Sequence, residues 1–262
     1  MFVSVLIGLG ISLLIAGLAY LKHSLNKSGF IAATFFGAVI YVFGGILVWG
    51  TLIAFFISSS VITKLSENKD KKHTEGRNYV QVIANSLVVT IFAVLFYIYK
   101  AEIFLLAAVV AISTSNSDTW ASEIGSMTKG KTFYILNFKV APKGVSGAIS
   151  GLGTFASFIG ALFIGIIFLS LYAITESITL TQILYFGFVI TSCGFLGNLI
   201  DSYLGALIQA KYRGIDTGTI TEKRWLPNEK VVLASGLALI TNDMVNVLSA
   251  LFASILTVIF FN

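Results

Sequence analysis

The stretch IFLLAAVVAISTSNSDTWASEIGS, residues 103–126, passes from an apolar segment directly into a polar one. The segment IFLLAAVVA has the composition of a membrane-crossing helix. Hydroxyl and amide side chains follow it and lead to Asp118 and Glu123. Because carboxylates are costly in a membrane, their presence there marks a functional position. The stretch therefore predicts a membrane span with a chemically active polar end.

The composition of the whole chain extends this prediction to an integral membrane protein. Of its 262 residues, 56% are hydrophobic and 11% are charged, whereas about a quarter of the residues in soluble domains are charged. The apolar runs are continuous rather than alternating, which favours helices over an outer-membrane barrel. We expect an all-α, polytopic helix bundle that forms a single membrane domain over residues 1–262.

Eight apolar segments reach or approach the length of about 20 residues that crosses the lipid hydrocarbon layer. The first is interpreted as a span rather than a removed signal peptide, because it lacks a basic start and a cleavage site. Residues 229–240 are expected to lie at the interface or to re-enter the membrane, and Thr241 to cap the helix that follows. The predicted spans are residues 2–21, 30–48, 50–64, 79–99, 102–117, 145–172, 182–205 and 242–261.

The basic residues define the predicted orientation of these spans. With eight spans, 16 of the 17 Lys and Arg residues lie at one face of the membrane and only Lys100 lies at the other. Basic loops mark the cytoplasmic side, so we expect both termini outside. The net charge of +5 then reflects membrane topology, and no nucleic-acid partner is expected.

Three aspartates fall near the predicted cytoplasmic face. Asp118 ends the fifth span, Asp201 lies about one turn before the end of the seventh, and Asp243 begins the eighth. Carboxylates at one depth repel each other, and a divalent cation bound by carboxylate and amide oxygens offsets that cost. We predict that the three aspartates are catalytic and bind Mg²⁺, although each alone could be a helix cap or a solvated residue. The asparagines that accompany them are Asn116, Asn198, Asn242 and Asn246.

A polar stripe marks the fourth predicted span. Arg77, Gln81 and Asn85 recur every four residues and therefore lie on one helix face. An unpaired amide in the apolar layer is costly, so the stripe is expected to face the same cavity as Asp118. Hydrogen bonding that only joins helices is the alternative.

A basic, glycine-rich segment precedes the sixth predicted span. Lys139, Lys143 and Gly144 lead into what is expected to be a helix N-terminus, where lysines and free backbone N–H groups can bind phosphate. The segment lacks a P-loop pattern. The lysines could instead reflect topology alone, and the glycines helix packing.

Five motifs carry a resemblance to a known family. In order, GRNYVQVIANS, NSDTWASEIG, PKGVSGAISGLGT, GFLGNLIDSYLGALIQ and LITNDMVN resemble family ninety-two of the domains of unknown function, which includes the plant phytyl-phosphate kinase. The chain is similar more distantly to CTP-using polyprenol kinases and phosphatidate cytidylyltransferases. The resemblance implies site positions at Arg77, Gln81, Asn85, Asn116, Asp118, Glu123, Lys143, Asp201, Asp243 and Asn246.

The activity that the resemblance implies is the phosphorylation of an isoprenoid monophosphate to the diphosphate. A nucleoside triphosphate, with CTP favoured, and Mg²⁺ would act at a cytoplasm-facing site beside the lipid bilayer. One alternative is a cytidylyltransferase that attaches CMP to a lipid phosphate. The other is a non-enzymatic, ion-coupled transporter, since intramembrane Asp and Asn also build such sites.

Overall fold

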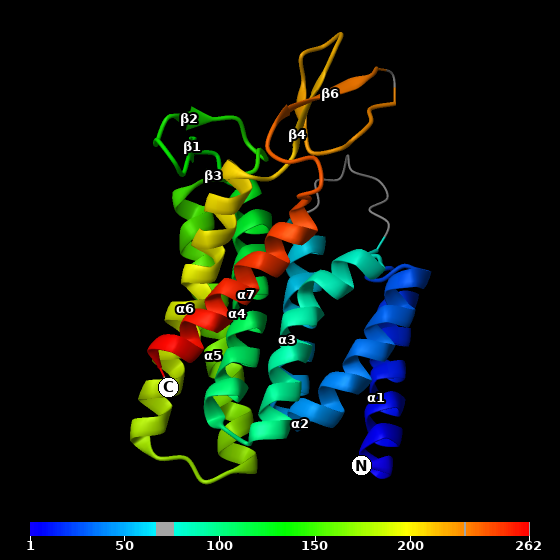
Figure 1. Cartoon of the computed structure of the whole chain (residues 1–262), viewed down its shortest axis with the longest axis vertical. Coiled ribbons are helices and arrows are strands. Elements are labelled where there is room, and N and C mark those ends of the chain that lie inside the picture. The colour runs from blue at the N-terminus through cyan, green and yellow to red at the C-terminus, as the bar shows by residue number, and fades with distance from the viewer. Residues whose placement is uncertain (67–75, 228, 262) are drawn as a thin grey trace.

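The computed structural model describes residues 1–66, 76–227 and 229–261. These residues form a helical membrane bundle, as predicted, with two small sheets at one end (Figure 1). The helices are α1 (Phe2–Leu21), α2 (Lys27–Ser66), α3 (Tyr79–Tyr99), α4 (Glu102–Ser126), α5 (Gly151–Thr175), α6 (Leu180–Leu207) and α7 (Asn242–Phe260).

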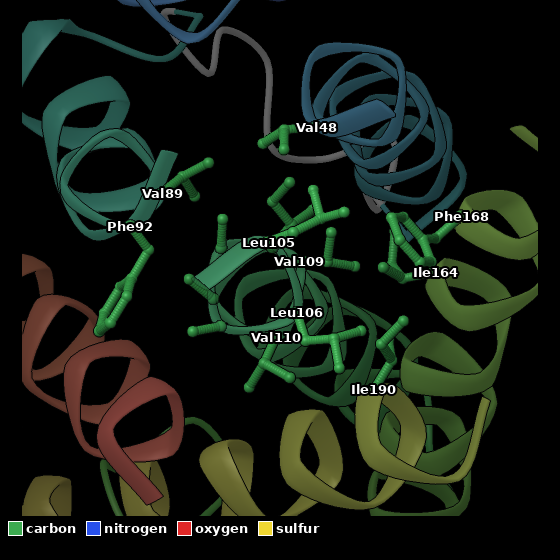
Figure 2. Close-up of a cluster of buried hydrophobic side chains, with 14 of the residues drawn as sticks. Val48, Val89, Phe92, Leu105, Leu106, Val109, Val110, Ile164, Phe168 and Ile190 are labelled. Carbon is green, nitrogen blue, oxygen red and sulfur yellow. The ribbon is translucent and has the colours of Figure 1, made fainter. Parts of the chain in front are cut away.

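Helix α4 is the centre of the bundle. It packs against α2, α3, α5, α6 and α7, and its residues from Leu105 to Ser117 are all buried. Figure 2 shows the apolar side chains of α4 pointing outward to these neighbours, with Leu106 and Val110 among them. Because α4 contacts protein on every side, it can carry a long polar run without exposing it to lipid.

Helix α2 doubles back at Gly45. This residue has φ +64° and ψ −166°, a backbone conformation outside the helical range. A straight helix of 40 residues would be about 60 Å long, yet the Lys64 ammonium donates a hydrogen bond of 3.0 Å to the Lys22 carbonyl just before α2. The two arms of α2 therefore begin and end at the same face, and they contain the predicted spans 30–48 and 50–64.

Six helices in the described residues are long and apolar enough to cross a membrane. The polar run in α4 keeps that helix out of this set, and α2 contributes two arms. The predicted count of eight crossings therefore stays a prediction, as does the location of both termini outside. Figure 1 shows the N-terminus and the C-terminal end of α7 in the half of the bundle away from the sheets.

Each small sheet has three antiparallel strands. The first has the order β2-β1-β3, formed by β1 (Thr132–Tyr134), β2 (Val140–Ala141) and β3 (Ala148–Ile149). The second has the order β5-β4-β6, formed by β4 (Lys211–Gly214), β5 (Ile220–Thr221) and β6 (Val231–Ser235).

The sheets correct two sequence predictions. Residues 229–240, predicted to lie at the interface or to re-enter the membrane, contain β6, which pairs with β4 in the sheet at the end of the bundle (Figure 1). The re-entrant alternative is therefore wrong, and the interfacial one stays a prediction. The sixth span begins at Gly151 rather than at residue 145, since β3 pairs with β1 before the helix starts. Apolar composition alone does not distinguish an exposed strand from a membrane segment. The Thr241 cap is confirmed, as its hydroxyl accepts from the Met244 amide over 3.4 Å.

Candidate functional site

The polar half of α4 continues as a helix well past Asp118. The sequence predicted that Asp118 ends its span, but α4 extends to Ser126. This extension packs closely on α5: a Cβ added at Gly153 would lie 2.9 Å from the Ala121 carbonyl oxygen and 3.3 Å from Gly125 Cα. Helix α5 therefore covers one side of this extension, while Ser122 and Ser126 on it line a polar cavity described below.

Asn116 is fully buried in the packing around α4. Its nitrogen donates to the Gly160 carbonyl oxygen over 2.7 Å, and its oxygen accepts from the Ser58 hydroxyl over 3.0 Å. Since both ends of the amide are occupied by protein groups, Asn116 joins α4 to α2 and α5. The structure does not bring it to either cavity described next.

The first polar cavity lies between α2, α3, α4 and α7, with a volume of about 530 Å³. We call it the arginine cavity. The predicted stripe of Arg77, Gln81 and Asn85 lines it together with Asp118, so the stripe and the aspartate do face one cavity. Its other acidic and amide residues are Glu123, Asn242, Asp243 and Asn246.

Glu123 is positioned at this cavity by the second arm of α2. Thr63 Oγ1 donates to Glu123 Oε1 over 2.9 Å, and the Ser66 hydroxyl donates to Glu123 Oε2. These contacts tie α4 to α2 at the polar end of the bundle. Glu123 also lies near Arg77: burial lowers the pKa of the Arg77 guanidinium, and the neighbouring Glu123 raises it in part.

The second polar cavity lies beneath the segment that joins β2 to α5, with a volume of about 280 Å³. We call it the loop cavity. Gly144 and Gly147 have φ of +76° and +81°, which side-chain-bearing residues rarely adopt. A Cβ at Gly147 would also lie 2.5 Å from Ala206 Cβ, so the loop lies directly on α6. The residues of interest in its lining are Asp118, Lys143, Gly144, Asn198, Asp201, Glu222 and Asn242.

The predicted phosphate cradle therefore takes a different form. Lys143 and Gly144 lie in a loop over the cavity, and the helix N-terminus comes later, with Ser150 as the cap of α5. Lys143 Nζ is held by the Thr128 carbonyl oxygen. Lys139 lies in the β1–β2 turn and lines neither polar cavity.

Asp201 is a buried carboxylate held by α7. Ser249 Oγ donates to its Oδ2 over 3.0 Å. The Asn246 amide, oriented so that both of its neighbours are satisfied, donates to the same oxygen over 3.1 Å and to the Asn242 carbonyl over 3.2 Å. Asp201 lies in the second-last turn of α6, and both it and Asp118 line the loop cavity.

Asn198 provides a test of whether this cavity suits a hard cation. Its nitrogen donates to Ser157 Oγ over 2.7 Å. Ser117 Oγ donates its proton to the Ser157 carbonyl oxygen over 2.7 Å, and it also lies 2.8 Å from Ser157 Oγ. Because a hydroxyl has one proton to donate, the Ser157 hydroxyl donates to Ser117 Oγ and accepts from the Asn198 nitrogen. The Asn198 oxygen is buried with no partner in the described residues. An unpaired amide oxygen on the same cavity as two carboxylates fits the ligands that Mg²⁺ prefers.

The three predicted metal aspartates are divided between the two cavities. Asp118 lines both, Asp201 lines the loop cavity, and Asp243 lines the arginine cavity. Within the described residues, no three His, Cys, Asp or Glu side chains are grouped closely enough to hold one ion. The geometry therefore favours Asp118, Asp201 and Asn198 as a ligand set over three carboxylates, and Mg²⁺ sites commonly use only one or two carboxylates with substrate phosphates.

Glu222 is a cavity residue that sequence reasoning missed. It follows β5 and lines the loop cavity with Asp201. Burial raises the pKa of the Glu222 carboxyl, and the nearby Lys211 ammonium lowers it in part. No sequence signal distinguished this glutamate from the charged residues beside it, because its position depends on the pairing of β4 with β5.

Together these features define a polytopic membrane protein with two polar cavities that meet at one end of its helix bundle. Residues 10–254 match the family described as integral membrane protein DUF92. The chain belongs to this family, as its five motifs predicted. No solved structure matches the chain.

Relatives in plants and archaea cover most of the chain. It is 32% identical to Protein PGR of Arabidopsis thaliana, over 94% of this chain and 92% of that protein. It is 31% identical to the membrane protein MJ0933 of Methanocaldococcus jannaschii, over 80% and 84%. Its identity to Protein VTE6, chloroplastic, of Arabidopsis thaliana is 24%, over 94% and 68%.

Proposed function

We propose that the protein is a membrane kinase that transfers a phosphoryl group from a nucleoside triphosphate, with CTP favoured, to an isoprenoid monophosphate. The observation that carries the proposal is the meeting of two polar cavities at Asp118 and Asn242, which line both. A transferase with two anionic substrates needs two adjoining sites with positive charge. Arg77 serves the arginine cavity and Lys143 the loop cavity.

The chemistry requires positioning more than covalent participation by the protein. An oxygen of the isoprenoid monophosphate attacks the γ-phosphorus of the nucleotide, a new P–O–P linkage forms, and the nucleoside diphosphate leaves with the electrons of the broken bond. The acceptor oxygen is already anionic, so no strong general base is needed. Arg77 would bind the acceptor phosphate, and Lys143 the donor phosphates.

Asp118, Asp201 and Asn198 are the residues that would hold Mg²⁺. When bound, this ion would neutralise the charge of the donor phosphates. Ser249 and Asn246 orient the Asp201 carboxylate, and Ser157 orients the Asn198 amide. The site would face the cytoplasm, because 16 of the 17 basic residues lie on the predicted cytoplasmic side.

The family resemblance supports an isoprenoid phosphate as substrate. A cytidylyltransferase would use the same cavities but direct the attack at the α-phosphorus. An ion-coupled transporter needs access from both faces of the membrane. The apolar residues of α4 from Leu105 to Ile112 are buried against the surrounding helices (Figure 2), which favours an enzyme with its site at one face.

The decisive experiment follows the fate of labelled CTP. Purified protein in lipid nanodiscs is incubated with a panel of prenyl monophosphates, with and without Mg²⁺. A kinase yields CDP and prenyl diphosphate, whereas a cytidylyltransferase yields pyrophosphate. Asp118→Asn and Asp201→Asn should abolish most turnover and leave the melting temperature nearly unchanged, since Asn preserves side-chain volume. Full activity in both variants, or substrate flux into proteoliposomes without nucleotide, would contradict the proposal.

A further inference from the structure

A third cavity lies on the membrane side of the arginine cavity. It is enclosed by α1, both arms of α2 and α3, and most of its lining is apolar, including Ile15, Ala33 and Leu52. Arg77, Gln81 and Asn85 line this apolar pocket as well as the arginine cavity. The two cavities therefore adjoin at these three residues, with the polar one on the side of Asp118 and the apolar one within the bundle.

Arg77 marks the boundary between the polar and apolar parts. Its guanidinium carbon lies 5.9 Å from the ring centre of Phe55 and 5.6 Å from that of Phe56, and both rings line the apolar pocket. Contact with aromatic faces holds the cation without neutralising it. A ligand with a phosphate at Arg77 would thus have its next atoms at the mouth of an apolar pocket.

The inner end of the pocket is closed by a specific contact. Trp49 Nε1 donates to Ser12 Oγ over 3.0 Å, and a Cβ added at Gly37 would lie 2.7 Å from the same oxygen. The side of the pocket that lies between α1 and α3 is less tightly packed. Helix α1 packs mainly against α2, whereas α3 packs against α2, α4 and α7, so α1 and α3 do not form an extensive interface that would separate the pocket from lipid.

We propose that this apolar pocket, with a volume of about 70 Å³, binds the phosphate-proximal isoprene unit of the substrate tail, and that the rest of the tail leaves between α1 and α3 into the bilayer. The assignment rests on the proposed function, because that function supplies the isoprenoid monophosphate. It adds the location of the tail and the residues that select it. Ala33 lines the pocket, so a larger side chain there would occupy the space of the tail.

The test measures binding without nucleotide, so that it does not depend on phosphoryl transfer. A farnesyl monophosphate with a photoreactive group in its first isoprene unit is crosslinked to the protein in nanodiscs, and labelled peptides are mapped by mass spectrometry. We expect labelling of α1, α2 and α3. Ala33→Phe should lower the labelling by about tenfold, because the pocket is filled.

The matched control is Ala32→Phe. Ala32 is adjacent in α2 but does not line the pocket, so this variant should retain labelling to within about twofold. Labelling confined to other helices, or equal labelling of the Ala33→Phe and wild-type proteins, would overturn the tail assignment. Failure of the proposed function looks different: the probe would still label the pocket, but no prenyl diphosphate would form from CTP.

Discussion

The side-chain nitrogen of Asn198 donates to Ser157 Oγ over 2.7 Å, and the Asn198 oxygen is left buried and unpartnered in the described residues. A buried polar atom without a partner costs free energy. Asp118 and Asp201 line the same cavity, so a bound cation would recover that cost. The unpaired oxygen thus links the packing of α5 and α6 to the proposed metal site.

We expect Asn198→Ala to raise the Mg²⁺ concentration needed for half-maximal activity by about tenfold or more. It should also reduce the increase in melting temperature that Mg²⁺ produces, because one ligand oxygen is lost. Asn198→Asp retains an oxygen and should keep most of both effects. Ser157→Ala leaves the amide free to rotate and should give an intermediate result. Unchanged Mg²⁺ dependence in Asn198→Ala would remove Asn198 from the ligand set.

Much of the fold and part of the site could be predicted from the sequence. Apolar run length located the helices, and the four-residue spacing of Gln81 and Asn85 placed both on one face of α3, which lines the arginine cavity. The prediction that Arg77 shares this helix face is wrong, because Arg77 precedes α3 and its backbone pairs with Leu25; it nevertheless lines the same cavity. Such local periodicity survives folding because a helix fixes the direction of each side chain.

The remaining features depend on contacts between distant segments. The sequence could not indicate that the Asn116 amide would be hydrogen-bonded at both ends, to the Gly160 carbonyl and the Ser58 hydroxyl. Nor could it indicate that the Asn198 oxygen would have no partner among the residues that the structure describes. The position of Glu222 likewise depends on the pairing of β4 with β5. Residue type identified candidates, but packing determined which of them face a cavity.

The two lysines before α5 should differ in function. Lys143 lines the loop cavity, and Lys139 lines neither polar cavity. Lys143→Met should raise the KM for CTP by about tenfold, because a charge-assisted contact with phosphate is lost, and should leave the KM for the prenyl monophosphate nearly unchanged. Lys139→Met is the matched control and should alter neither constant. Steady-state kinetics with each substrate varied separately would reveal equal effects if the lysines served topology alone.

The predicted orientation can be tested with single cysteines. Cys193 is buried, so the wild-type protein gives little background. Lys131→Cys, before β1, should react with a membrane-impermeant thiol reagent only from the cytoplasmic side. Ser177→Cys, in the connection between α5 and α6, should react only from outside, because the basic loops are expected to face the cytoplasm. The reverse pattern would invert the topology and move the two cavities to the external face.

Two glutamates in the second sheet region should respond to pH with opposite signs. Burial raises the pKa of the Glu222 carboxyl above its ordinary value of 4.5. The pKa of Glu229 is lowered by hydrogen bonds to its carboxylate, from Thr217 Oγ1 over 2.6 Å and from the Asp216 and Thr217 amides over 2.9 and 3.0 Å. Folding therefore favours the protonated form of Glu222 and the ionised form of Glu229.

Linkage gives the direction of each effect on stability. For Glu222, the folded state binds the proton more tightly, so its contribution to stability falls as pH rises from 4.5 through the raised pKa. Glu222→Gln should then melt at a higher temperature than the wild type at neutral pH, with a difference that shrinks on acidification.

For Glu229, the contribution of the carboxylate to stability is complete above its unfolded pKa and is lost as pH falls through the lowered folded value. Glu229→Gln should therefore melt at a lower temperature at neutral pH, again with a shrinking difference. Thermal melts in detergent with EDTA, from pH 3 to 8, measure both variants under one protocol, and differences of the same sign would contradict the assigned environments of the two carboxyl groups.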